Sequence, residues 1–246
     1  MSKFADRIRR VSRLEAQPMG FVTTRNTADA TMVLVGLARD ARAAAEMAQR
    51  GADAVVVGSA GSSAGADDAK QIADAIPGAW LDGRSDGASK ACKDGGYDFV
   101  LFDPDKTAST AVLEEGIGYV ISVPNDVSDN ELRAIEGFSL DALYVGEIKG
   151  AMTVRKQMEL RRMFGLARKP LMASIPADLT QSELQALRDT NVLVVATDSA
   201  DGIEKLRTLV DALPPRSRRK EDPERPIAMV PRSAPGAGEE DDDDDD

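Results

Sequence analysis

Eight short apolar runs recur along the chain, and their first residues are separated by 20 to 29 positions. The runs cover residues 32–38, 54–59, 79–82, 99–103, 119–123, 142–147, 171–175 and 192–198. They are rich in Val, Leu, Ile and Ala and alternate little with polar residues, which is typical of parallel strands buried on both faces. A helix-like stretch lies between each pair of runs, so the pattern predicts eight strand–helix units.

Eight units at this interval are the signature of a (β/α)8 barrel, a fold that takes about 250 residues. The chain has 246 residues and is identified as a member of the TIM-barrel class. We therefore predict an α/β fold with a single barrel over residues 21–213. Capping boxes are expected at Ser128 and Thr180, which are followed three positions later by Glu131 and Glu183. The helix of the fourth unit, near 111–115, is predicted to be short, and that of the sixth to cover about 153–164.

The two ends of the chain differ from the barrel pattern. In residues 1–20, Phe4, Ile8, Val11 and Leu14 fall at helical spacing among arginines, which predicts an amphipathic helix. We expect this helix to pack on the bottom or the side of the barrel, and a membrane-surface helix is the alternative. Residues 214–246 contain few bulky apolar side chains and are predicted to be a disordered tail, first basic and then acidic.

Net charge and cysteine content limit the binding partners and the cellular compartment that we expect for this chain. The formal charge is −11, but residues 239–246 contribute eight negative charges and leave only −3 for the rest. Because no general basic field remains, nucleic acid is not an expected partner. No apolar run reaches the length of a membrane span. Two kinds of partner stay possible, which are further copies of this chain in a homo-oligomer and a protein bound by the tail. The single cysteine, Cys92, predicts a reducing, cytoplasmic location and a buried structural thiol.

Catalytic residues of TIM barrels come from the carboxyl ends of the strands. Four apolar runs end there in an acidic residue: Asp82, Asp103, Glu147 and Asp198. Carboxylates from neighbouring strands suit Mg²⁺, which prefers oxygen ligands. We expect Asp103 and Glu147 to bind the metal and Asp82 or Asp198 to assist catalysis. Lys106 and Lys149 would then act as a base, a Schiff-base amine or an anion clamp. The alternative is that these carboxylates cap the following helices or form salt bridges at the rim.

One segment suggests a phosphate group. Residues 51–59, G-A-D-A-V-V-V-G-S, resemble the segment that holds phosphate in barrels acting on sugar phosphates or flavin mononucleotide. The resemblance implies that the amides of Gly58 and Ser59 contact a substrate phosphate. In those barrels the segment belongs to the eighth unit, whereas here it belongs to the second. A mobile surface loop is the alternative. Arg84 and Ser174, near the ends of two other strands, complete the expected substrate-binding set.

Two functions fit these features. The first is a metal-assisted lyase, aldolase or isomerase acting on a small oxygenated, in some cases phosphorylated, metabolite. The second is a non-catalytic TIM barrel used for binding or assembly. The chain has no histidine, which removes the usual imidazole base and every histidine-containing metal site. Whether the rim carboxylates converge on a common pocket would discriminate the two.

Overall fold

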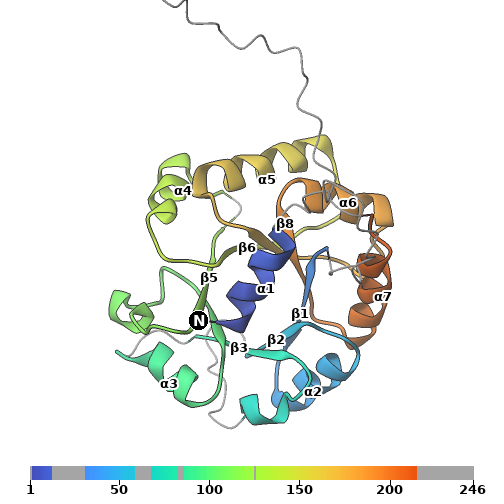
Figure 1. Cartoon of the computed structure of the whole chain (residues 1–246). Coiled ribbons are helices and arrows are strands. Elements are labelled where there is room, and N and C mark those ends of the chain that lie inside the picture. Colours follow the sequence, from blue (N-terminus) through green and yellow to red (C-terminus); the bar gives the residue numbers. More distant parts are fainter. Residues whose placement is uncertain (1, 13–30, 59–67, 82–85, 125, 215–246) are drawn as a thin grey trace, which may run out of the picture. The chain divides into compact units, whose positions relative to one another are not determined.

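The computed structural model describes residues 2–12, 31–58, 68–81, 86–124 and 126–214. Within them, eight parallel strands pair in sequence order and close into a barrel, as predicted (Figure 1). The strands are β1 (Val33–Ala38), β2 (Ala54–Val57), β3 (Ile76–Trp80), β4 (Phe99–Phe102), β5 (Gly118–Ser122), β6 (Ala142–Glu147), β7 (Leu171–Ser174) and β8 (Val192–Thr197).

Most of the connections are helical, and they form the outer layer of the barrel. The α-helices are α1 (Lys3–Ser12), α2 (Ala41–Gln49), α3 (Ala88–Asp94), α4 (Asp129–Glu136), α5 (Val154–Ala167), α6 (Gln181–Asp189) and α7 (Ala200–Asp211). Both predicted capping boxes are present, at Ser128 and at Thr180. No helix in the described part of the chain is long and apolar enough to cross a bilayer.

Three local predictions were wrong in detail. The third strand begins at Ile76 and ends at Trp80, whereas the apolar run predicted 79–82. Pro77 and Gly78 interrupt the run without interrupting the strand, which still pairs with β2. Among the described residues, the second and fourth connections contain the 3₁₀ turns η1 (Asp68–Gln71) and η2 (Ser109–Val112), where α-helices were expected. Both are four residues long, which suits the tighter 3₁₀ geometry.

The barrel has an outer core between strands and helices and an inner core in its lumen. The lumen holds side chains from all eight strands, including Val35, Val56, Leu101 and Met172. These four are at most 1% exposed, so the middle of the lumen is a packed apolar interior. This arrangement leaves only the two ends of the barrel for polar chemistry.

Helix α1 closes the amino-terminal end of the lumen. Phe4, Ile8 and Val11 belong to the inner core, and the Phe4 ring stacks on that of Phe99 with centroids 3.9 Å apart. Figure 1 shows α1 lying across the ring of strands. The expected packing on the barrel bottom is thus confirmed. Leu14, the fourth apolar residue of the predicted helix, lies outside the described residues.

Candidate functional site

At the amino-terminal end of the strands, the charged groups hold α1 in place. Asp53, whose side chain is 9% exposed, accepts hydrogen bonds from the guanidinium of Arg7 at 2.7 Å and from the amide of Leu34 at 2.9 Å. Arg207 approaches the same carboxylate at 3.3 Å. Asp98 accepts hydrogen bonds from the amides of Lys3 and Phe4. These carboxylates are fully engaged in fixing the helix.

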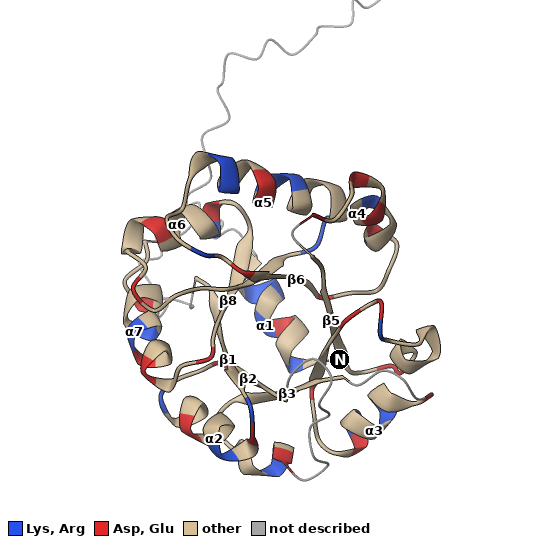
Figure 2. Cartoon of the chain, turned by 180° about the vertical axis from the view of Figure 1, so that it is seen from behind, with Lys and Arg blue, Asp and Glu red and all other residues tan. Residues whose placement is uncertain are grey.

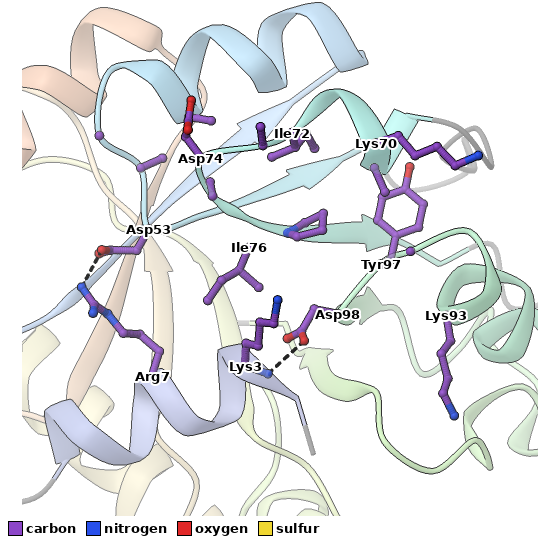
Figure 3. A pocket seen from close by; sticks show the side chains of 18 of the residues that line it. Lys3, Arg7, Asp53, Lys70, Ile72, Asp74, Ile76, Lys93, Tyr97 and Asp98 are labelled. Carbon is purple, nitrogen blue, oxygen red and sulfur yellow. Dashed lines mark hydrogen bonds and ion pairs between the residues drawn. The ribbon is translucent and has the colours of Figure 1, made fainter.

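A cavity of about 880 Å³ opens beside this network (Figure 3). It is lined by Lys3, Arg7, Tyr97 and the two engaged aspartates, and by Lys93, whose ammonium contacts Glu114 at 2.6 Å. The active site of TIM-barrel enzymes lies at the opposite, carboxyl-end face, whereas this face serves stability. The size of the cavity therefore does not make it the candidate site.

The carboxyl end of the lumen is where the inner core becomes polar. Tyr144 on β6 and Ser174 on β7 are half-buried, and their hydroxyl oxygens lie 3.3 Å apart in a hydrogen bond. The ring of Trp80 on β3 meets that of Tyr144 edge-on, with centroids 6.4 Å apart. Both rings pack on the apolar lumen residues below them. They cover the inner core at the carboxyl end of the barrel, which we call the mouth.

An irregularity in β6 places Glu147 at this mouth. The pairing of β6 with β7 shifts between Tyr144 and Glu147, and Gly146 in that interval has φ of 75°. That angle lies in the left-handed region, which glycine adopts without strain. The shift brings Glu147 into register with Ser174. Bulges of this kind re-aim side chains next to active sites.

Each predicted metal ligand is paired with a predicted catalytic lysine. The Asp103 carboxylate contacts the ammonium of Lys106 at 2.8 Å and also accepts a hydrogen bond from the amide of Asp105. The hydrogen bond from Lys106 is the main cause of a lowered pKa at Asp103. Asp103 therefore stays ionised at neutral pH. Glu147 lies 3.3 Å from the ammonium of Lys149, and both of these side chains are more than half exposed.

The remaining predicted residues are spread around the rim. Gly58 follows β2 with φ of 96°, and its amide donates to the carbonyl of Ala38. Asp198 follows β8 and is exposed, directly before Ser199, which caps α7. Ser59, Asp82 and Arg84 lie outside the described residues. Within the described ranges, no three His, Cys, Asp or Glu side chains are grouped to hold a metal ion.

Sequence reasoning missed Trp80, Tyr144 and Ser122, because it looked for residues that end an apolar run. Strand alternation could have found them. Val120 faces the lumen, so Ser122, two positions later on β5, faces it too. Cys92 was predicted to be buried, but it is only half-buried, packed against the outer core, and burial raises the pKa of its thiol.

No protein-family model and no functionally curated protein matches this chain. Its fold does match solved structures. The tryptophan synthase alpha-subunit of Pyrococcus furiosus superposes with a TM-score of 0.54 at 12% identity, over 74% of this chain and 97% of that one. Phosphoribosyl anthranilate isomerase of Thermus thermophilus gives 0.52 at 10% identity, over 73% and 98%.

A HpcH/HpaI aldolase/citrate lyase family protein of Burkholderia cenocepacia gives a TM-score of 0.50 at 13% identity, over 72% of this chain and 91% of that one. These similarities and the closed barrel show that the chain is a TIM barrel. The structural neighbours are enzymes. At such identities the likeness concerns the fold alone, since one barrel carries many chemistries.

Proposed function

We propose that this protein is an enzyme that acts on a small oxygenated metabolite at the carboxyl-end mouth of its barrel, by lyase, aldolase or isomerase chemistry. The observation that carries the proposal is the Tyr144–Ser174 hydroxyl pair, half-buried at the carboxyl end of the apolar lumen. The opposite end is covered by α1, and TIM-barrel enzymes carry their active sites at the carboxyl end. The named activities of the structural neighbours support the reaction class coarsely.

The mouth holds the groups that such chemistry needs. Bond cleavage or proton transfer next to a carbonyl creates negative charge on its oxygen, which hydrogen-bond donors or a metal ion stabilise. The hydroxyls of Tyr144 and Ser174 are suitable donors. Asp103 and Glu147 are the proposed ligands of Mg²⁺. Asp198 and Asp82 are proposed to assist, and Ser59 and Arg84 to contact a phosphate where the substrate has one. The predicted contact from the amide of Gly58 does not fit, because that amide donates to the carbonyl of Ala38.

Metal binding would also change the state of the lysines. Asp103 and Glu147 now neutralise Lys106 and Lys149. If Asp103 and Glu147 held a cation, Lys106 and Lys149 would lose their present partners. An amine without its carboxylate partner could then act as the base or the Schiff-base nucleophile. We propose that the metal and the lysine base are linked in this way.

Calorimetry tests the metal site. At a hundredfold excess over its dissociation constant, Mg²⁺ or Mn²⁺ should raise the unfolding free energy by about 2.7 kcal/mol. Asp103→Asn and Glu147→Gln should each abolish this increase without unfolding the metal-free protein. Glu159→Gln, an exposed carboxylate on α5 that pairs with Arg155, is the matched control. A metal effect that survives both mouth substitutions would place the ion elsewhere.

A non-catalytic binding barrel is the second candidate. It is favoured by one observation, which is that Asp103 already uses both carboxylate oxygens within its own loop. A loop whose carboxylate is already bound by its own amide and ammonium groups does not need a metal ion to hold its conformation. If neither metal ion changes the unfolding of the wild-type protein, this second function takes precedence over the metal-assisted reaction.

A further inference from the structure

Helix α5 presents an apolar pair to the outside of the barrel. Within the described residues, four large apolar side chains are at least 60% exposed: Leu113, Phe138, Val154 and Met158. Val154 and Met158 lie one turn apart, so they adjoin on one face of α5. Figure 1 shows this helix on the outer side of the barrel, between α4 and α6. Scattered single apolar residues are ordinary on a surface, so the adjoining pair is the feature to explain.

The barrel itself makes little use of these two side chains. α5 packs on the barrel through Leu160, Met163 and Ala167, which are at most 6% exposed. Val154 is 72% exposed and Met158 is 60% exposed. Covering them would remove apolar area from water, which contributes about 25 cal/mol per Å². A partner that covers this face would therefore gain stability that the single chain does not.

A pair of opposite charges lies beside the apolar pair. Arg155 and Glu159 each follow one of the two apolar residues by one position, so they flank the pair on one side. Their side chains contact at 3.2 Å, and both are more than half exposed. An exposed pair of this kind within one helix contributes little stability, so both groups are available to a second partner.

The neighbouring cations are directed elsewhere. Lys156 donates to the carbonyls of Lys149 and Ala151, at the start of the helix. Arg162 pairs with the Asp129 carboxylate of α4. The polar part of the face is therefore defined by one cation and one anion that are one turn apart, rather than by an excess of one sign.

We infer that α5 is the contact surface between two copies of this chain, which cross antiparallel about a two-fold axis between residues 156 and 157. In a two-fold interface, residue i of one copy meets residue j of the other, and j meets i. Val154 then lies against Met158 of the partner subunit. On the flank, Arg155 faces Glu159 of the partner subunit. The inference goes beyond the proposed function and does not depend on it.

The charges favour this arrangement over a parallel one. In a parallel pair each residue would meet its own copy, so Arg155 would face a second arginine and Glu159 a second glutamate. In the antiparallel pair, Arg161, which is also exposed, would be about 13 Å from its counterpart along the helix axes. That separation exceeds the Debye length of about 10 Å at 0.1 M salt, so the two arginines are largely screened.

The size of the face predicts a weak dimer. A stable interface buries at least about 1,000 Å² in total. α5 has 14 residues and is about 21 Å long. The exposed Gly150 and Ala151, just before the helix, would extend the contact along the partner subunit's helix. An interface near this lower limit associates weakly, so we expect a dissociation constant in the micromolar range.

Sedimentation of the full-length protein over a concentration series measures this dimer. Met158→Glu places a charge in the apolar contact and should weaken dimerisation at least about tenfold. Leu113→Glu is the matched control, because it adds the same charge at an exposed apolar residue directly after η2. The control should leave the dissociation constant unchanged.

An exchange of charges tests the pairing between copies. Arg155→Glu makes the flank of α5 acidic, and Glu159→Arg makes it basic. Each variant alone should therefore dimerise at least about tenfold more weakly than the wild type. An equimolar mixture of the two should form the mixed dimer, because the acidic flank of one then faces the basic flank of the other. Native mass spectrometry distinguishes the mixed dimer by its mass.

A wild-type chain that stays monomeric would overturn the inference. If Met158→Glu then increases the Stokes radius of the monomer, residues 215–246 of the same chain occupy the face instead. If the radius stays constant, the face is left to a different protein. The inference is equally wrong if Met158→Glu and Leu113→Glu weaken the dimer alike, or if mixing the two charge variants restores no dimer.

Discussion

Gly78 shows how one small residue decides the packing of the lumen. A Cβ atom at this position would lie 2.3 Å from Cζ of Phe99, far inside van der Waals contact. Phe99 has little room to move, because its ring is stacked on that of Phe4 with an interplanar angle of 10°. The Phe99 ring thus occupies the space that a side chain at position 78 would need. The same ring supports α1.

Gly78→Ala should therefore destabilise the protein by about 1–3 kcal/mol or more, since overpacking forces the ring out of place. Gly165→Ala is the matched control. A Cβ at 165 meets nothing within 4 Å, and alanine is favoured over glycine by about 1 kcal/mol in a helix interior. Denaturant unfolding should show opposite signs for the two substitutions. Equal effects would mean that the ring relaxes freely.

Asp141 carries a second residue-scale effect. Burial is the main cause of its raised pKa, although Arg9 and Lys169 partly offset it. The folded state thus takes up a proton more readily than the unfolded state, so this group contributes more stability at low pH and loses that contribution as pH rises through its folded-state pKa.

Asp141→Asn should consequently stabilise the protein at pH 7, because the amide removes the cost of a buried charge and its oxygen can still accept the hydrogen bond from the amide of Tyr119. The advantage should shrink as pH falls, since the wild-type carboxyl becomes neutral as well. Melting curves from pH 7 down to pH 4 would follow the difference. A gap that widens on acidification would contradict this assignment.

At the scale of elements, α1 is tied to the barrel by a capping residue that is distant in sequence. Asp98, just before β4, binds the amides of Lys3 and Phe4 at 2.9 and 2.8 Å and the hydroxyl of Ser2 at 2.7 Å. The first amides of a helix have no partner within the helix, so an acceptor there is stabilising. The cap thus fixes the entry of α1 over the lumen.

Asp98→Ala should cost about 1–3 kcal/mol, the loss of hydrogen bonds to a charged acceptor. Hydrogen exchange should accelerate at the amides of α1 and stay slow in the strands. Asp6→Ala is the comparison, because Asp6 forms only an exposed pair with Arg9. If both variants exchange alike, the capping role of Asp98 is wrong.

The sequence predicted the elements better than the site, and the reason is physical. Buried parallel strands leave continuous apolar runs, so seven of the eight strands overlapped their predicted ranges closely, and only Pro77 and Gly78 concealed the start of β3. The pairing of Asp103 with Lys106 depends on side-chain geometry in a loop, which no periodicity records. The register shift that places Glu147 beside Ser174 likewise appears only in the folded barrel.

For the whole molecule, the two ends of the barrel have different tasks. Figure 2 shows acidic and basic residues mainly on the helices and at strand ends, with largely uncharged strands between. The apolar lumen separates Asp53 and its arginines from Tyr144 and Ser174. The amino-terminal end thus supports stability, and the carboxyl end is free to carry function. Strand β2 connects the two ends, because Asp53 directly precedes it at the amino-terminal end and Gly58 directly follows it at the carboxyl end.

This separation predicts additivity. Asp53→Asn weakens a network with Arg7 and Arg207 and should lower the unfolding free energy by about 1–3 kcal/mol. Tyr144→Phe should cost at most about 1 kcal/mol of stability, since its hydroxyl is only half-buried. Sites with no shared partners add within about 0.5 kcal/mol, so the double variant should show the sum of both losses. A double variant whose loss of unfolding free energy departs from that sum would show that the lumen couples the two ends, and α1 would then act on the mouth.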